Sequence, residues 1–169
     1  MHTLKPKAKE GHLKVVGISE MVISDLQDDV LVTYSLGSCI AVAAWDKVER
    51  IGGIIHCLLP RGNKSPEQAK STPARFVDVG VTQFLKELFE AGARRESLVI
   101  KIAGASSPLK EVEGLRIGER NYATLKKVFW KNSLLVEAAR VGGSLPRTLS
   151  LRIEDGRTAI SSGRIEEEI

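Results

Sequence analysis

Long hydrophobic runs, aromatic residues and clustered charge are all scarce in this chain of 169 residues. The longest purely apolar run, Ile40 to Trp45, is far shorter than the roughly 20 residues that span a bilayer, so we expect no insertion into a membrane. No apolar segment of the kind found in signal peptides follows the first lysines. Because only 5% of the residues are aromatic, the core should be built from aliphatic side chains.

Cysteine is also scarce, and Cys39 and Cys57 have neither the number nor the spacing of a disulfide framework or a zinc site. We therefore expect reduced thiols, a cytoplasmic location and no bound metal. The formal net charge is +4, but the basic residues are scattered, which argues against binding to nucleic acid. The one local excess of lysine lies in residues 1–13, predicted to form a flexible basic arm. Attraction of this arm to an acidic protein stays open.

Residues 14–169 contain no repeat, linker or change of composition that would divide them, so they predict one domain. The clearest helix is expected to begin at Thr72 and Pro73, a capping residue followed by proline, and to end at Gly92. Strands come first, helices are inserted and strands follow, which is typical of an α+β fold with helices on one side of mixed sheets. The other expected segments are strands at 15–24, 28–36, 40–45, 52–59, 97–105, 133–143, 147–155 and 157–161, a helix at 119–131 and an exposed loop at 61–71.

Cys39 and His56 form a pair that thiol chemistry uses and that strand packing does not need. If the strands on either side of a four-residue loop at 46–49 form a hairpin, Cys39 stands directly opposite His56, with Cβ atoms about 4.5–5.5 Å apart. The same register places small alanine side chains beside Cys39, which leaves room for a substrate above the sheet. It also turns Cys57 to the other face, toward the core. A slip of one residue would reverse both assignments.

A histidine beside a cysteine can take the thiol proton, hold the thiolate in an ion pair and later donate the proton to a leaving group. Gly37 and Ser38 can let the backbone turn sharply before Cys39 and aim N–H groups at an oxyanion. A purely structural interpretation stays open, because buried cysteine is common in cores. Thr33 has the same parity as Cys39, but six residues of straight strand span about 20 Å. It is an ordinary strand residue unless the chain bends, or unless it contacts His56 from an adjacent strand.

Two longer patterns surround these residues. Thr33 to Cys39 reads T-x-x-x-G-S-C, and Gly52 to Pro60 reads G-G-x-x-H-x-x-L-P. In this order and spacing, both resemble patterns of the CheD family of chemoreceptor glutamine deamidases. The resemblance covers about residues 16–160 and is supported by Arg75–Asp78, Gly92–Arg94, Ile117–Asn121 and Gly142–Gly143.

The resemblance implies a cysteine hydrolase, a protein-glutamine glutaminase, which converts selected receptor glutamines to glutamates and releases ammonia. It implies Cys39 as the nucleophile, His56 as the general base and acid, and Thr33 as a third catalytic residue that orients His56. No metal or organic cofactor is called for. The implied fold is the layered α/β/β arrangement of CheD and of cysteine hydrolases of the cytotoxic-necrotizing-factor type.

The implied substrates are the cytoplasmic domains of methyl-accepting chemotaxis receptors, and a second implied partner is a CheC-like phosphatase of the response regulator CheY. Two other functions stay open, namely a regulatory partner of CheC without catalysis and a different thiol hydrolase. The joint presence of Thr33, Cys39 and His56 favours the deamidase, because a protein that only binds needs none of them.

Overall fold

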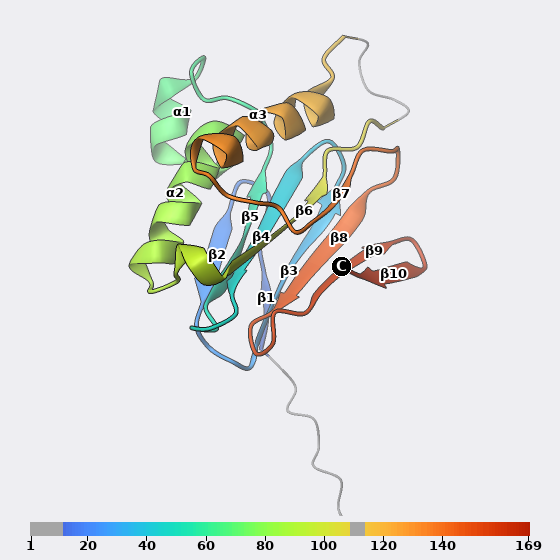
Figure 1. Ribbon diagram of the computed structural model, residues 1–169. Helices are drawn as coiled ribbons and strands as arrows, with labels where there is room; N and C mark the ends of the chain where they lie inside the picture. Colours follow the sequence, from blue (N-terminus) through green and yellow to red (C-terminus); the bar gives the residue numbers. More distant parts are fainter. Residues whose placement is uncertain (1–11, 109–113) are drawn as a thin grey trace, which may run out of the picture.

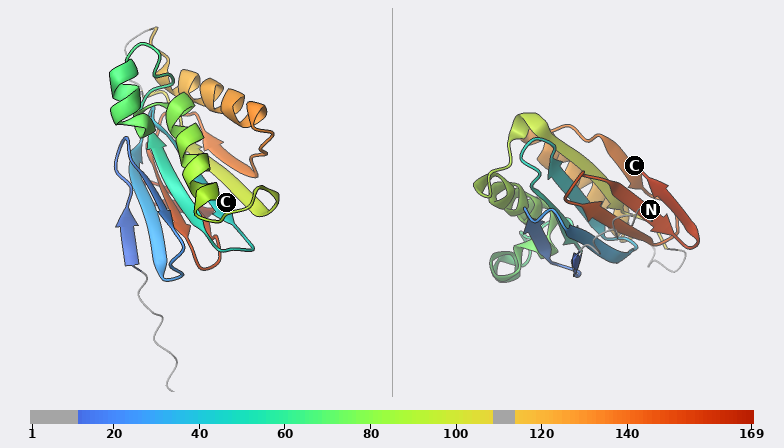
Figure 2. Two further views of the ribbon diagram at one scale, coloured as in Figure 1. Left: turned by 90° about the vertical axis from the view of Figure 1, so that its left-hand side faces the viewer. Right: turned by 90° about the horizontal axis from the view of Figure 1, so that it is seen from below.

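The computed structural model describes residues 12–108 and 114–169, which form three layers (Figure 1). Two five-stranded sheets stack face to face, and the helices cover the free face of one of them (Figure 2). The inner sheet contains, in order, β2 (Met21–Ser24), β5 (Gly52–Cys57), β4 (Ile40–Asp46), β6 (Leu98–Gly104) and β7 (Ala138–Val141). The outer sheet contains, in order, β1 (His12–Val15), β3 (Asp29–Leu36), β8 (Arg147–Arg152), β9 (Thr158–Ser162) and β10 (Ile165–Glu168).

Both sheets are mixed, because β1 runs parallel to β3 and β6 runs parallel to β7, while the other neighbours are antiparallel. The expected α+β class, with a layered α/β/β arrangement and helices on one side, is confirmed. The helices are α1 (Pro66–Ser71), α2 (Val77–Glu90) and α3 (Ile117–Lys131), with 3₁₀ turns at Pro73–Arg75 and Arg95–Ser97. Over the described ranges, none of them is both long and apolar enough to cross a membrane.

The first core lies between the helices and the inner sheet. Phe84 and Leu88 of α2 and Leu125 of α3 are fully buried there, in one cluster with Ile55 and Cys57 of β5. Buried apolar residues recur at intervals of three or four positions along both α2 and α3, so one face of each helix is apolar. Most side chains of this core are aliphatic, as the low aromatic content predicted.

The second core lies between the two sheets and is lined by alanine on the inner side. Ala41 and Ala43 of β4 belong to one buried cluster with Leu31 of β3 and with Leu149 and Leu151 of β8. Small side chains on one sheet let large side chains of the other approach closely. The space expected above the alanines is thus filled by the outer sheet and is not open to a substrate, which corrects that prediction.

The helical region departs from expectation at its start. Residues 66–71 form α1 where an exposed loop was expected, and α1 buries none of its residues. Thr72 provides no side-chain cap, and α2 begins only at Val77, because Phe76 is extended and forms a bridge with Leu59. Gly92 ends the helical segment as expected, with a left-handed φ of 111°.

The two ends of the chain also differ from the predicted strands. The expected strand at 15–24 is split between β1 and β2, which belong to different sheets, and β10 was not expected. Residues 1–11 of the predicted basic arm lie outside the described residues, and the boundary predicted at residue 13 falls inside β1.

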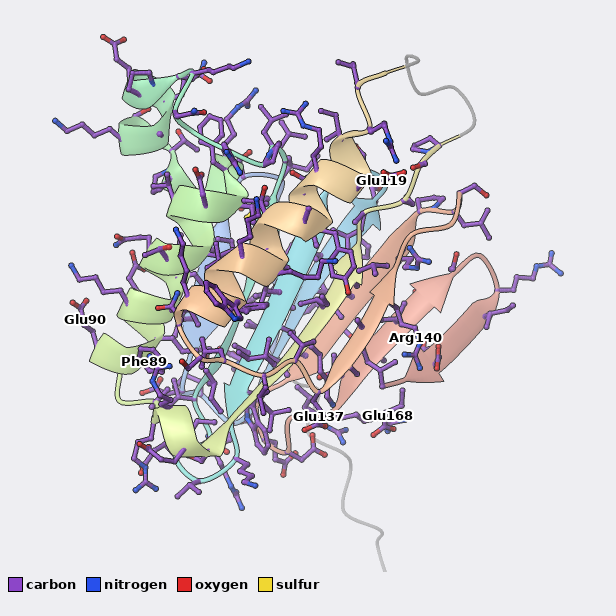
Figure 3. The ribbon with its side chains drawn as sticks, turned by 45° about the horizontal axis from the view of Figure 1, so that its top comes forward. Phe89, Glu90, Glu119, Glu137, Arg140 and Glu168 are labelled. Carbon is purple, nitrogen blue, oxygen red and sulfur yellow. The ribbon has the colours of Figure 1, made fainter. Side chains whose placement is uncertain are left out.

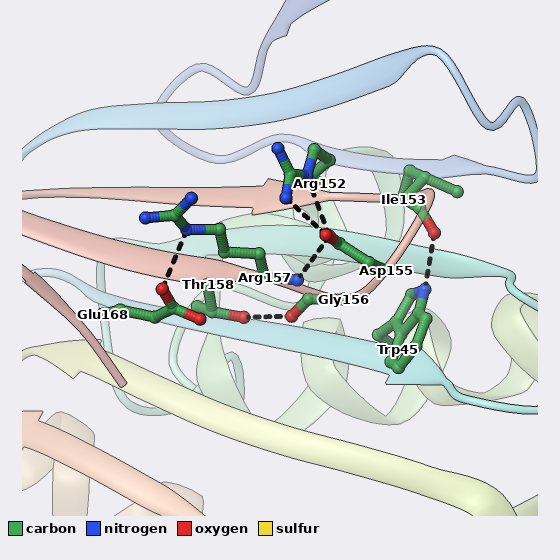
Figure 4. A network of polar contacts seen from close by, with 8 residues as sticks. All are labelled: Trp45, Arg152, Ile153, Asp155, Gly156, Arg157, Thr158 and Glu168. Carbon is green, nitrogen blue, oxygen red and sulfur yellow. Dashed lines mark hydrogen bonds and ion pairs between the residues drawn. The ribbon is translucent and has the colours of Figure 1, made fainter.

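A polar network ties the sheets together at the end of β4 that is distant from Cys39 (Figure 4). The indole Nε1 of Trp45 donates a hydrogen bond of 2.8 Å to the carbonyl oxygen of Ile153 in the outer layer. Gly156 has a left-handed φ of 72°, and a Cβ atom there would lie 2.2 Å from the Trp45 ring. Arg157 Nε pairs with Glu168 at 2.9 Å beside this contact. Glycine is therefore required where the turn crosses the indole.

Candidate active site

The hairpin of β4 and β5 forms as expected, but its register is different. Ala41 pairs with His56 and Ile40 pairs with Cys57, so the prediction that Cys39 stands directly opposite His56 is wrong by two residues. An even shift keeps every side chain on its predicted face. Cys39 therefore lies on the same intersheet face as His56, as its diagonal neighbour on the adjacent strand. Diagonal neighbours in a sheet are typically about 7–8 Å apart, with somewhat less between their Cβ atoms.

The position of the turn explains the shift. Arg50 adopts a left-handed φ of 54°, and its N–H donates to the carbonyl oxygen of Asp46 at 2.8 Å. The Asp46 carboxylate also accepts hydrogen bonds from the N–H groups of Val48 and Glu49, at 2.8 and 3.1 Å. Asp46 N–H also donates to the carbonyl oxygen of Ile51 at 2.8 Å, so these two residues face each other and the loop takes residues 47–50. It keeps the four residues that the sequence suggested but begins one position later, which moves the register by two.

Thr33 reaches His56 from the facing sheet. The Thr33 Oγ1 atom lies 2.7 Å from His56 Nδ1 and 2.7 Å from the carbonyl oxygen of Val16, both in the buried interior. A hydroxyl group has one hydrogen to donate, and the carbonyl of Val16 can only accept. Thr33 therefore donates to Val16 and accepts from an Nδ1–H of His56. This arrangement fixes the neutral ring with its hydrogen on Nδ1 and a bare lone pair on Nε2.

The bare nitrogen has no protein partner within the described residues. His56 is only 1% exposed, and its Nε2 is buried without a hydrogen bond. Burial lowers the pKa of His56 to about 4, so the ring is neutral at physiological pH. A neutral imidazole held in one tautomer with a free Nε2 is the form that a general base requires.

Cys39 lies at the edge of the intersheet core, directly before β4, and is 7% exposed. Burial raises the pKa of the Cys39 thiol above its usual value. The direction of both shifts favours an uncharged thiol beside an uncharged imidazole, in contrast to the ion pair expected from the sequence. The thiolate must therefore be generated during the reaction, by transfer of its proton to the imidazole.

The backbone before Cys39 bends sharply, and Ser35 makes the bend. Ser35 has a left-handed φ of 58°, and the pairing of β3 with β8 is interrupted between Thr33 and Leu36. Gly37 does not have a left-handed φ, and its N–H donates to the carbonyl oxygen of Ser35 at 2.9 Å. Among the described residues, no acceptor in another residue takes the N–H of Ser38 or Cys39, and the Cys39 N–H points toward its own sulfur, which it helps to stabilise as a thiolate. These two N–H groups are the ones available to an oxyanion.

A tight backbone contact supports the far side of this turn. Ala105 N–H donates to the carbonyl oxygen of Cys39 at 2.7 Å, and Ser106 N–H donates to that of Gly37 at 2.9 Å. Gly104 has a φ of 111°, and a Cβ atom there would lie 2.3 Å from the Cys39 carbonyl oxygen. Only glycine allows this approach, so Gly104 holds the nucleophile segment against β6.

Asn121 of α3 is a site residue that sequence reasoning did not assign. Its Nδ2 donates to the carbonyl oxygen of Ser38 at 2.9 Å and to that of Leu58 at 3.1 Å, and the residue is fully buried. One amide thus joins the segment before Cys39 to the segment after His56. The signal available in the sequence was a polar residue among the apolar positions of the helix at 119–131.

Cys57 lies in the helix-side core, as expected, and is fully buried. Burial raises the pKa of its thiol strongly, which leaves it unreactive. Both cysteines are free thiols. In the ranges 12–108 and 114–169, no group of three or more histidine, cysteine or acidic side chains is placed to hold a metal ion.

Comparison with known proteins finds the same family that the sequence resembles. The family model for CheD, described as CheD chemotactic sensory transduction, matches residues 58–162. A protein of Syntrophus aciditrophicus (strain SB) named "Probable chemoreceptor glutamine deamidase CheD 1" is 38% identical over 148 residues, which cover 88% of this chain and 92% of that protein.

Two further relatives carry the same kind of name. "Probable chemoreceptor glutamine deamidase CheD 2" of Anaeromyxobacter dehalogenans (strain 2CP-C) is 38% identical over 151 residues, covering 89% of this chain and 95% of that protein. The corresponding protein of Symbiobacterium thermophilum is 37% identical over 166 residues, covering 93% of this chain and 97% of that protein. Together with the matching family model, these similarities show that the chain belongs to the CheD family.

Proposed function

We propose that this chain is a chemoreceptor glutamine deamidase, a protein-glutamine glutaminase with Cys39 as its nucleophile. Its relatives carry this activity in their names, and the chain belongs to their family. The observation that carries the proposal is the bare, buried Nε2 of His56, fixed by Thr33 on the sheet face that it shares with Cys39. An imidazole arranged in this way can accept a proton from a donor that is brought to Nε2.

The reaction begins with a proton transfer from the Cys39 thiol to His56 Nε2. The sulfur then attacks the carboxamide carbon of a substrate glutamine, and the N–H groups of Ser38 and Cys39 donate to the oxygen that becomes negative. As the tetrahedral intermediate collapses, the C–N bond breaks and Nε2–H gives its proton to the departing nitrogen. Ammonia leaves, and the glutamyl group stays on the sulfur as a thioester.

The second half regenerates the enzyme. His56 Nε2, again unprotonated, takes a proton from water as the water oxygen attacks the thioester carbon. The C–S bond then breaks, the sulfur recovers its proton from His56, and glutamate is released. Thr33 holds Nδ1–H throughout, so the positive ring that forms in each half keeps a hydrogen-bond acceptor. No step requires a metal or an organic cofactor.

The proposed setting is chemotaxis adaptation in the cytoplasm, where the cytoplasmic domains of methyl-accepting receptors are the substrates. A CheC-like phosphatase remains a predicted second partner.

The test is ammonia release from a receptor cytoplasmic domain, measured for the wild type and for two matched cysteine variants. Cys39→Ala should abolish release, because it removes the nucleophile. Cys57→Ala should retain most of it, because Cys57 faces the helices on the other side of the inner sheet. Loss of activity in Cys57→Ala together with a normal rate for Cys39→Ala would overturn the assignment.

A further inference from the structure

A basic cavity lies between the segment after β5 and helix α3 and has no role in the chemistry described above. It has a volume of about 560 Å³. The segment 59–65 forms one wall and α3 forms the other, and Figure 1 shows these two elements at the same end of the molecule as α1. Its lining includes the side chains of Leu59 and Phe76 as an apolar floor. The volume is in the range of ligand sites in proteins.

The charge of the cavity is of one sign. Arg61 and Lys64 line it from one wall, and Arg120 and Lys127 line it from the other. No carboxylate is among its described lining residues, and none of the four cations forms an ion pair with another described residue. Glu119, at the start of α3 (Figure 3), pairs with Arg116 and does not line the cavity. Four cations with no ion-pair partner in the described part of the chain surround one hollow and create a positive potential that attracts acidic groups.

The wall carrying Arg61 and Lys64 is held in place by hydrogen bonds. Val77 N–H donates to the carbonyl oxygen of Leu59 at 2.8 Å, and Asp78 N–H donates to that of Pro60 at 3.2 Å. The Asp78 carboxylate in turn accepts from Gly62 N–H at 3.1 Å. A wall that is fixed before binding loses little conformational entropy when a ligand arrives.

One side chain next to the cavity also contacts the segment that carries Cys39. Asn121 donates hydrogen bonds to the carbonyl oxygens of Ser38 and Leu58. Ser38 directly precedes Cys39, and Leu58 directly precedes the cavity residue Leu59. The residue before Asn121 on α3, Arg120, lines the cavity. A polypeptide whose glutamine entered the site could therefore place neighbouring residues over the basic walls.

We propose that this cavity binds an acidic segment of the protein substrate that flanks the reactive glutamine. This inference rests on the proposed deamidase function and adds a charge preference to it. A peptide fits the cavity better than a nucleic acid, because the one aromatic residue in the lining, Phe76, is 2% exposed and offers no stacking surface. Arg120 and Lys127 stand seven positions apart, about 10 Å along the helix, which suits more than one carboxylate.

The experiment compares short peptides that contain one glutamine and differ only in flanking residues, glutamate in one set and serine in the other. At low salt, the wild type should deamidate the glutamate-flanked peptide with a kcat/KM about tenfold higher, and about 0.5 M salt should remove the difference. Arg120→Gln combined with Lys127→Gln should also remove it. The matched control, Lys86→Gln combined with Lys131→Gln, alters two lysines outside the cavity and should retain it.

Binding separates a failure of this inference from a failure of the proposed function. In the Cys39→Ala background, fluorescence anisotropy should show tighter binding of the glutamate-flanked peptide, lost in the Arg120→Gln, Lys127→Gln variant, whether or not the wild type releases ammonia. Equal affinity for both peptides overturns the inference. An equal loss of binding in the Lys86→Gln, Lys131→Gln control also overturns it. The same holds if an oligonucleotide or inorganic phosphate displaces the acidic peptide at a lower concentration than unlabelled peptide does.

Discussion

Replacement of Thr33 by valine removes one oxygen atom from the site and nearly preserves its shape. That oxygen donates to the carbonyl of Val16 and accepts from His56 Nδ1–H, at 2.7 Å in each case. Valine would leave both partners buried without a hydrogen bond, and each such group costs about 1–3 kcal/mol. We therefore expect the free energy of unfolding to fall by about 2–4 kcal/mol. The threonine is fully buried, so water cannot replace the lost oxygen.

The effect on activity follows from the tautomer. Without an acceptor at Nδ1, the ring hydrogen can move to Nε2, and the nitrogen meant to take the Cys39 proton then carries one already. General acid–base catalysis contributes about 10²–10⁴-fold, so kcat should fall by roughly 10²-fold while KM changes little. Thr33→Ser keeps the hydroxyl and should stay within about tenfold of the wild type, which makes it the matched control.

Nitrogen-15 NMR of the His56 ring, with ammonia-release kinetics, provides the assay. The wild type should show a protonated Nδ1 and an unprotonated Nε2, unchanged as the pH falls from about 8 to about 5, because the pKa of His56 lies at about 4. Thr33→Val should show a mixture of tautomers. A wild-type kcat in Thr33→Val, or a hydrogen on Nε2 in the wild type at neutral pH, would refute the reasoning.

Three further predictions concern the support of the site and the state of the thiol. Asn121→Ala should lower the free energy of unfolding by about 2–4 kcal/mol in urea titrations and reduce kcat, since two buried carbonyls lose their donor. Asn132→Ala, at the half-buried C-cap of α3, removes one hydrogen bond to a carbonyl of the last helical turn and should cost under about 1 kcal/mol. An equal loss of unfolding free energy in both variants would contradict the role of Asn121 in joining the two segments. Gly156→Ala should lower the melting temperature far more than Gly163→Ala, because both have a left-handed φ but only Gly156 faces an indole, with nothing within 4 Å of a Cβ at Gly163. Similar shifts would argue against that contact. The rate of Cys39 alkylation by iodoacetamide should keep rising as the pH passes above the usual thiol range, because burial raises this pKa and the thiolate appears only above it. A rate already constant at neutral pH would mean that an ion pair exists before substrate binds.

The faces of the site could be predicted from the sequence, because side chains alternate strictly along a strand. Cys39 and Cys57 were assigned to opposite faces correctly, even though the register was wrong by two residues. The error came from the turn, where the Asp46 carboxylate and a left-handed Arg50 stabilise a loop that begins one position later than expected. Side-chain hydrogen bonds of this kind leave little trace in hydrophobic periodicity.

The position of Thr33 could not be predicted, because it depends on which sheet each strand joins. The threonine was expected to contact His56, if at all, from an adjacent strand, and it does so instead from the sheet stacked above. The late start of α2 has a similar cause, since the bridge between Leu59 and Phe76 overrides the capping signal of Thr72. Long-range contacts decided both features.

Peptide mass mapping of a receptor cytoplasmic domain treated in ¹⁸O-labelled water tests the central claim most directly. Hydrolysis through a Cys39 thioester should replace a side-chain NH₂ by a labelled OH and add about three daltons at specific glutamines, against about one dalton in ordinary water. The Cys39→Ala variant should leave every glutamine unchanged. A receptor whose glutamines are unmodified by the wild type, or modified equally by Cys39→Ala, would contradict the account.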